Sequence, residues 1–295
     1  MGKAKRGATS LSGILAVDKP QAMTSHDVVD EIRRITGEGR VGHTGTLDPM
    51  ATGLLLVCVG PATRLSDLIA SQEKVYQARV VFGFATDTDD ADGTVIASAP
   101  LPDNLADSQS ATQILDGFVG SQEQIPPQFA AIKQDGLRAY KAARRGMSVD
   151  LKPRVVTVHS IRLMGAAENY WDIEAHVSKG TYIRSLARDL GEAVGSKAHL
   201  AALRRIRCGQ ATIEQAHSLE ELRLSKDIRC FFLDLQRDLG IPQALIPKSL
   251  QELDVTGGDV TGDVTRGRFS CHVTGGDVTG GDVTGRQITG GQNAL

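Results

Sequence analysis

The residue that first suggests chemistry is Asp48, which lies in the stretch GRVGHTGTLDPMATGLLLVCVG of residues 39–60. Asp and Pro both favour turns, because Asp bonds its own backbone and Pro fixes φ, so one interpretation of Asp48 is a structural turn. The other interpretation is a nucleophilic carboxylate at the mouth of a cleft. Because Pro49 disfavours the helical region for the residue before it, Asp48 is expected in an extended loop.

The segments on either side of this loop are predicted to be rigid. Residues 24–36 predict an amphipathic helix, because Thr24 and Asp27 have capping-box spacing and one face carries Val28, Val29, Ile32 and Ile35. Gly37 is expected to end that helix. The apolar run at 54–59 is short and bounded by glycines, which predicts a buried central strand. Asp48 is therefore expected to lie beside a rigid base.

Two further candidates lie in WDIEAHVSKGTYIRSLARDLGEAVG, residues 171–195. Apolar residues alternate from Trp171 to Val177, which predicts a half-buried strand, and those from Ile183 to Leu190 recur with helical spacing. Tyr182 and Arg184 lie at the predicted strand-to-helix junction. They are either a tyrosine at a sheet edge and a surface arginine, or two side chains aimed into a shared cleft.

An acidic stretch follows an alternating segment at residues 74–97. The pattern around Tyr76 predicts a strand, an acidic turn and a second strand from Thr94, which together form a hairpin. The turn TDTDDADG fails the EF-hand pattern, because Thr88 takes the first ligand position and Ala99 the last. Its aspartates are expected to form the turn, with one free to pair with an arginine.

Composition and motifs bound the function classes. With 41% hydrophobic and 23% charged residues, the 295-residue chain has the composition of one large domain, alone or with a small one. The cysteines show neither zinc spacing nor a disulfide framework, which favours the cytosol. No segment has membrane-spanning length. The familiar phosphate-loop, GxSxG and HExxH motifs do not occur.

The formal net charge of −2 gives no overall nucleic-acid signal, but basic residues cluster. One cluster contains Lys133, Arg138, Lys141, Arg144 and Arg145, and another contains Arg204, Arg205 and Arg207. Each cluster alone is consistent with a solvated face. Together with Arg33 and Arg34, expected on the solvent side of their helix, they favour a polyanion-binding footprint.

Both ends of the chain have unusual composition. The basic residues 1–10 are expected to be disordered. From residue 254 the tetrad Asp-Val-Thr-Gly recurs at 254, 259, 277 and 282. Units this short do not form solenoid repeats, so disorder and a small strand-and-turn appendage both stay open.

The motifs resemble one family along much of the chain. GHTGTLDPMATGLLLVCVG is similar to the signature of the TruB family of tRNA pseudouridine-55 synthases, bacterial type. The similarity continues in VDKP, YQARVVFGFATDTDDADG, IPPQFAAIKQDGLRAYKAARRG and GTYIRSLARDLG, and it runs in order from residue 11 to residue 210. It implies an α+β (mixed α/β) fold with a central, mostly antiparallel sheet flanked by helices and loops. The implied parts are a catalytic domain at 11–235, with an RNA-closing thumb at 124–152, and a C-terminal segment at 236–295. The family usually ends in a PUA-like module, of which only RGRF at 266–269 is evident, so that segment is expected to be degenerate or disordered.

The resemblance also implies roles for individual residues. Asp48 matches the catalytic aspartate, with Arg184 and Tyr76 in the catalytic set. Substrate-contacting positions match His43, Lys19, Tyr76, Tyr182 and Leu203. Asp90, also assigned to the substrate site, matches the partner of Arg184 in an ion pair near the nucleophile. Arg184 is then expected to lower the pKa of Asp48 and to aim it.

The implied reaction breaks the N1–C1′ bond of uridine, turns the base and rejoins it through C5, so no cofactor and no metal are expected. The target must be extruded from the RNA, with Tyr76 as a stacking platform and His43 in the vacated space. The implied partner is the T arm and loop of tRNA, and we expect a cytoplasmic monomer that does not bind membranes. A non-catalytic RNA-binding protein or tRNA-folding chaperone and a guide-RNA-dependent synthase are the alternatives.

Overall fold

The computed structural model describes residues 9–130, 133–134, 137–138, 151–247 and 250. The chain divides into two units, Met1–Val260 and Thr261–Leu295, and every described residue belongs to the first. The predictions for the basic N-terminal residues up to 8, for most of the thumb and for the repeat tail lie outside the described residues.

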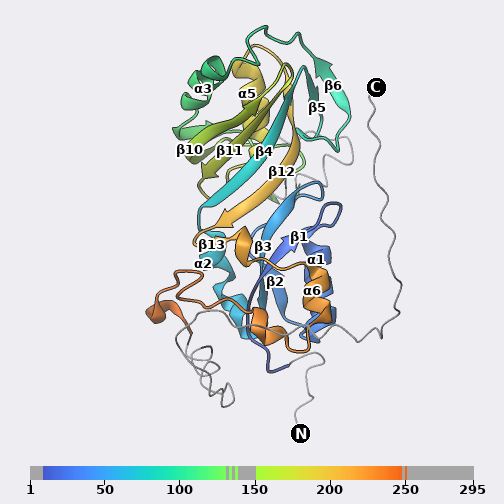
Figure 1. The fold of residues 1–295 in the computed structure, drawn as a ribbon, viewed down its shortest axis with the longest axis vertical. Coiled ribbons are helices and arrows are strands. Elements are labelled where there is room, and N and C mark those ends of the chain that lie inside the picture. Colours follow the sequence, from blue (N-terminus) through green and yellow to red (C-terminus); the bar gives the residue numbers. More distant parts are fainter. Residues whose placement is uncertain (1–8, 131–132, 135–136, 139–150, 248–249, 251–295) are drawn as a thin grey trace, which may run out of the picture. The chain divides into compact units, whose positions relative to one another are not determined.

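One large sheet organises the described part of the chain. Its main path is β1-β3-β12-β4-β11-β10-β7, while β2 pairs with β3 and β13 with β12. All neighbours are antiparallel except β3 and β12, which are parallel. The long strands β12 and β4 run side by side through it (Figure 1). This arrangement confirms the predicted α+β class with a mostly antiparallel sheet. The strands are β1 (Gly13–Lys19), β2 (Val41–His43), β3 (Thr52–Val59), β4 (Lys74–Phe82), β7 (Gly120–Gln124), β10 (Arg154–Ala166), β11 (Tyr170–Val177), β12 (Ala198–Cys208) and β13 (Ala211–Thr212).

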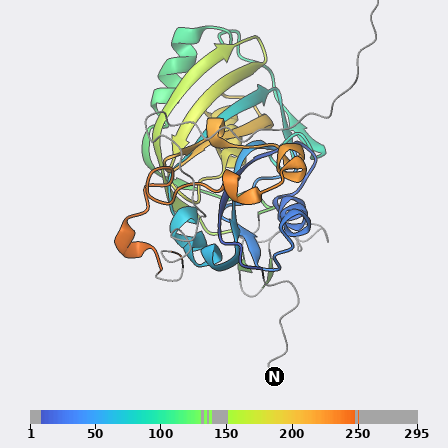
Figure 2. The same cartoon turned by 60° about the horizontal axis from the view of Figure 1, so that its bottom comes forward.

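Short helices and two small sheets accompany the large sheet. The α-helices are α1 (Ser25–Thr36), α2 (Ser66–Ala70), α3 (Ser108–Asp116), α5 (Ile183–Ala193) and α6 (Leu219–Leu224). The small sheets pair β5 (Phe84–Thr86) with β6 (Val95–Ser98) and β8 (Lys133–Gln134) with β9 (Leu137–Arg138). Figure 2 shows α3 alongside the olive strands β10 and β11. Within the described ranges, no helix has the length and apolarity that a membrane span requires.

Helix α1 forms as its sequence predicts. Thr24 caps it, and the side chain of Asp27 accepts from the backbone of Thr24 in return. Val28, Val29 and Ile32 are buried, and Gly37 ends the helix in the left-handed conformation with φ of 66°. Arg34 faces solvent as predicted, but Arg33 also donates to the carbonyl of Val41, so it ties the helix to β2.

Strands β1 and β3 are buried on both faces. Leu15, Leu55 and Val57 belong to one apolar cluster, while Ile14, Leu54 and Leu56 belong to a second cluster. This two-sided burial explains the unbroken apolar run and confirms the predicted central strand. Burial also raises the pKa of the Cys58 thiol to about 12, in keeping with a reduced core cysteine. Leu239 and Ile241 join the second cluster, so the core extends beyond residue 235.

The predicted hairpin at 74–97 is only partly correct. β4 does not pair with the strand from Thr94; it lies between β12 and β11 in the large sheet. The chain breaks at Gly83, which has φ of 104°, and the shorter β5 then forms the hairpin with β6. The prediction failed because alternation marks a strand without identifying its partner.

Candidate active site

The loop that carries Asp48 is anchored from two sides. Ser25 at the start of α1 exchanges hydrogen bonds with the backbone of Leu47, at 2.8 and 3.0 Å. The backbone N–H of Ala22 donates to the carbonyl of Pro49 at 2.8 Å, and Ala51 donates to the carbonyl of Asp48 at 3.0 Å. Asp48 therefore occupies a non-helical loop, as predicted, and that loop is held by backbone contacts.

Arg184 meets Asp48 from the first turn of α5. Its Nε lies 3.0 Å from Asp48 Oδ2, and its Nη1 lies 3.4 Å from Asp90 Oδ2. The guanidinium also donates to the carbonyl of Thr88 at 3.1 Å. The side chain of Arg184 is 6% exposed, against 33% for Asp48. One buried cation thus joins two carboxylates, and the planar fork fixes the direction in which Asp48 points.

The electrostatics of Asp48 differ from the sequence-based expectation. Burial raises the pKa of Asp48 above its usual value, and the nearby Asp90 acts in the same direction. Arg184 lowers the pKa, as expected, but does not outweigh burial. The net shift is nevertheless upward, because burial has the larger effect and the sequence does not reveal how far the carboxylate is removed from water.

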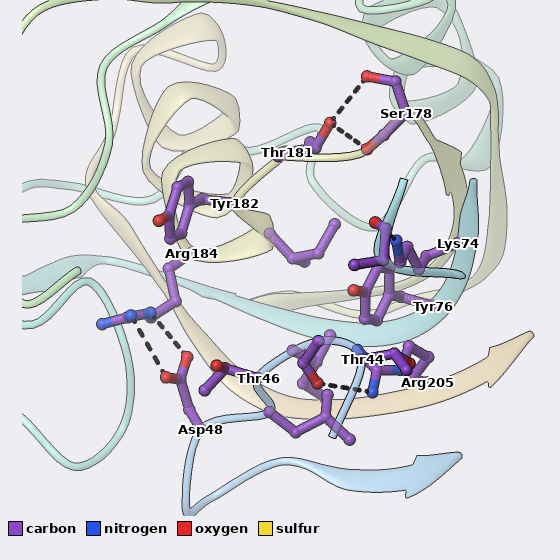
Figure 3. A pocket seen from close by; sticks show the side chains of 16 residues that line it. Thr44, Thr46, Asp48, Lys74, Tyr76, Ser178, Thr181, Tyr182, Arg184 and Arg205 are labelled. Carbon is purple, nitrogen blue, oxygen red and sulfur yellow. Dashed lines mark hydrogen bonds and ion pairs between the residues drawn. The ribbon is translucent and has the colours of Figure 1, made fainter. Parts of the chain in front are cut away.

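Asp48 and Arg184 line one end of a pocket of about 280 Å³ (Figure 3). Tyr76 of β4 and Leu203 of β12 form part of its wall, and both are largely buried. Tyr182 lines it at the start of α5. The structure therefore brings Asp48, Tyr76 and Leu203 together with Tyr182 and Arg184, although only the last two lie close together in the sequence.

Tyr182 is fixed by the far edge of the sheet. Its backbone N–H donates to the side chain of Gln124 at 2.8 Å, and the amide of Gln124 returns a bond to the Tyr182 carbonyl at 3.2 Å. The guanidinium carbon of Arg154 lies 5.3 Å from the centre of the Tyr182 ring. Burial raises the pKa of Tyr182, so the phenol stays protonated at neutral pH. Strands β7 and β10 thus hold one wall of the pocket.

His43 and Lys19 do not line this pocket. Lys19 is fully buried, and its Nζ donates to the carbonyls of Pro20 and Met23 at 2.8 and 2.6 Å. Burial lowers the pKa of Lys19 to about 8 although Asp48 opposes the shift. Burial and the charge of Arg205 lower the pKa of His43, whose buried Nδ1 has no hydrogen-bond partner among the described residues. His43 is therefore a neutral imidazole. Lys19 contacts the Asp48 loop through the carbonyl of Pro49, at 3.4 Å.

Arg205 is a pocket residue whose role the sequence did not reveal. It is 2% exposed, and its guanidinium donates to the carbonyls of Leu54 and Gly45 at 2.7 and 3.1 Å. Its neighbour Arg204 pairs with Asp18 at 2.8 Å. The run 204–207 therefore does not form one cationic face, because alternate residues of β12 point to opposite sides of the sheet. The sequence signal for Arg205 was its place in the basic run 204–207.

The pocket lining contains one carboxylate that can act as a base or as a nucleophile. Asp48 is the single carboxylate in the described lining, and the lining holds no histidine or cysteine. That donor set does not make a metal site. An aspartate held by an arginine, beside tyrosine and leucine walls, is suited to attack an electrophilic centre of a flat substrate or to stabilise a cation that forms on it.

The comparisons with known proteins define the class. The family model TruB family pseudouridylate synthase (N terminal domain) matches residues 33–183, and that of the tRNA pseudouridylate synthase B C-terminal domain matches residues 184–228. The fold is that of a pseudouridylate synthase. The chain belongs to the TruB family.

Similar proteins support this assignment. A tRNA pseudouridine synthase B of Bordetella parapertussis is 41% identical over 246 residues, which are 83% of this chain and 99% of that protein. One of Thermobifida fusca is 49% identical over 71% of this chain and 74% of that protein. Among solved structures, one described as a Cbf5-Nop10-Gar1 complex is similar with a TM-score of 0.56 and 27% identity, over 78% of this chain and 57% of that chain.

Proposed function

We propose that this chain is a tRNA pseudouridine synthase that isomerises uridine 55 in the T loop of tRNA, with Asp48 as its catalytic carboxylate. The observation that carries the proposal is the 3.0 Å ion pair between Asp48 and the buried Arg184 in the pocket of a TruB-family chain. The relatives named tRNA pseudouridine synthase B support tRNA as the substrate.

The reaction conserves atoms and electrons, which fits a site built around one carboxylate. The N1–C1′ bond breaks, the uracil turns, and a C5–C1′ bond forms; C5 loses its proton and N1 gains one. Asp48 serves either as a covalent nucleophile or as the counter-charge to a cationic sugar, and both roles need the ionised form. Arg184 favours that form, whereas burial opposes it.

The target nucleotide must leave the RNA stack before it can reach Asp48. Enzymes that act on bases recover part of this cost by stacking the extruded base against side chains. Tyr76 and Leu203 supply the flat apolar surface, and Tyr182 closes the opposite side. The neutral imidazole of His43 is suited to pack against uncharged bases. It is proposed to fill the space that the extruded uridine leaves in the RNA stack. The thumb at 124–152 would add phosphate contacts that position the T arm without reading sequence.

Two alternatives predict different behaviour. A non-catalytic RNA-binding protein or tRNA-folding chaperone has no use for a carboxylate held by a buried arginine in a pocket, so the Asp48–Arg184 ion pair supports catalysis. A guide-RNA-dependent synthase would need a second RNA for activity. The protein is proposed to act alone, as a monomer in the cytoplasm.

The experiment is an incubation of the purified protein with an unmodified tRNA transcript, followed by mapping of pseudouridine at single-nucleotide resolution. We expect conversion at position 55 without any added RNA, metal or cofactor. A transcript with cytidine at that position is the matched control and should stay unmodified. Conversion only at other positions would refute the proposed target, and no conversion despite tight binding would favour the chaperone.

A further inference from the structure

Three side chains on the outer face of the sheet converge away from the pocket. Glu73 directly precedes β4, His176 lies on β11, and His159 lies on β10. The Glu73 carboxylate oxygens lie 3.1 Å from Nε2 of His159 and 2.8 Å from Nε2 of His176. One ligand atom from each residue lies within 4.8 Å of those from the other two.

The register of the sheet produces this convergence. His176 pairs with Val75, so Glu73, two residues before Val75, has its side chain on the same face. Regular alternation would turn His159 away, since Ser160 pairs with His176. A register shift between Val158 and Ser160 leaves His159 as an extra residue, and a bulge of this kind redirects a side chain. The two imidazole rings consequently lie 4.8 Å apart, centre to centre.

Hydrogen bonding alone does not satisfy the cluster. Nη2 of Arg207 lies 3.2 Å from Nε2 of His176, and a guanidinium can only donate. The Glu73 carboxylate, 2.8 Å from the same nitrogen, can only accept when ionised. One imidazole nitrogen cannot serve both partners. A cation bound at the lone pair would satisfy the nitrogen and the carboxylate together.

We propose that Glu73, His159 and His176 form a binding site for a divalent transition-metal ion of the zinc type. Two imidazole nitrogens and one carboxylate are a donor set that zinc takes at about 2.0–2.2 Å, with water in the fourth position. Donors around such a tetrahedral ion lie about 3.4 Å apart, so the present spacing needs only small side-chain adjustments. Glu73 is 52% exposed and His159 33%, which leaves them free to make these adjustments.

This site is independent of the proposed catalysis. The sequence predicted no metal here, because Glu73 lies before β4, the histidines lie on β10 and β11, and the three residues have no motif spacing. Mg²⁺ is not expected to bind, since it prefers an all-oxygen set. Arg207 is expected to oppose binding, because its charge faces the His176 ligand.

The test is calorimetric titration of the full chain with ZnCl₂, with Co²⁺ absorption as a second readout of coordination. We expect each single variant of the three ligands to lose one zinc equivalent or to bind it at least about 10-fold more weakly: Glu73→Gln, His159→Gln and His176→Gln. Loss of a residue that only supports a metal ligand already weakens binding by about that factor. Each variant should also lose the rise in melting temperature that zinc gives the wild type. Arg207→Ala should tighten binding.

Two matched controls separate this site from other zinc-binding groups on the chain. His26→Gln removes an exposed histidine of α1, and Glu174→Gln removes a carboxylate on the same sheet face; both should bind zinc like the wild type. The proposal is overturned if the triple variant of the three ligands binds as many zinc ions as the wild type, with equal affinity. It is also overturned if Mg²⁺ displaces zinc at equal concentration.

Discussion

Replacing Arg184 with lysine keeps a positive charge opposite Asp48 but removes the planar fork. In the structure, Nε contacts Asp48 at 3.0 Å while Nη1 contacts Asp90 at 3.4 Å. A single ammonium cannot occupy both positions. The substitution should therefore leave one carboxylate without its contact and let Asp48 depart from its attacking direction.

The expected loss follows from the contact removed. A hydrogen bond to a charged group contributes about 1.5–3 kcal/mol, which corresponds to about a 10- to 150-fold change in rate. Because the Asp48 side chain is 33% exposed, solvent weakens the pair, and the lower half of that range is expected. Arg184→Lys should thus lower kcat by about 10- to 50-fold. The acid limb of its pH profile should stay close to that of the wild type.

Arg184→Met removes the charge as well. Burial already raises the pKa of Asp48, and Arg184 is the largest opposing influence. Without it the pKa of Asp48 rises further, so the acid limb of the activity profile should lie at higher pH than in the wild type.

The assay is release of tritium from tRNA labelled at C5 of uridine, under single turnover across the pH range. Arg188→Lys is the matched control, because Arg188 lies one turn further along α5 and pairs with Asp89 at 2.9 Å outside the pocket lining. Equal rates for Arg184→Lys and Arg188→Lys, or a wild-type acid limb in Arg184→Met, would refute these roles of Arg184.

Other predictions concern stability. Gly53 has φ of 99°, and a Cβ there would lie 2.3 Å from the carbonyl oxygen of Arg205. Gly53→Ala should therefore lower the free energy of unfolding, measured with denaturant, by about 1–3 kcal/mol or more. Gly42→Ala, with no atom within 4 Å of its Cβ, should cost much less; equal losses would contradict this. The raised pKa of Asp48 means that its ionisation destabilises the fold as pH rises through that pKa, so Asp48→Asn should melt higher than the wild type at neutral pH. The difference should vanish below the ordinary aspartate pKa of about 3.9, and a lower melting temperature at neutral pH would count against it. Removing residues 254–295 should leave the melting temperature and saturated turnover nearly intact. The segment has few large apolar residues, so its burial would not offset an ordering cost of about 1–2 kcal/mol per residue. A clear drop in melting temperature would show that the segment packs on the core.

Local pattern predicted the elements whose causes are local. The capping residues and apolar face of α1, the two-sided burial of β3 and the strand-to-helix junction before Arg184 all depend on neighbours within a few positions. The partner of β4 was predicted incorrectly, since pairing joins segments far apart in the sequence. Within the sheet, the extra residue at His159 likewise has no sequence signature.

The identity of the candidate site residues could be predicted, but the pKa shift of Asp48 could not. Resemblance selected Asp48, Arg184 and Tyr76, and the structure brings them to one pocket. The direction of the Asp48 pKa depends on its burial, which many distant residues create. Arg205 was grouped with its basic neighbours, although its carbonyl partners lie about 150 positions earlier in the chain. Such contacts require the fold to be known.

The most direct test of the account is pseudouridine formation by Asp48→Asn on an unmodified tRNA transcript, measured beside tRNA binding by the same preparation. The amide keeps the shape of the side chain but cannot carry the negative charge that either catalytic role requires. We expect tRNA binding close to that of the wild type and no pseudouridine at position 55. Conversion of that uridine by Asp48→Asn free of wild-type protein would contradict the central role of the carboxylate.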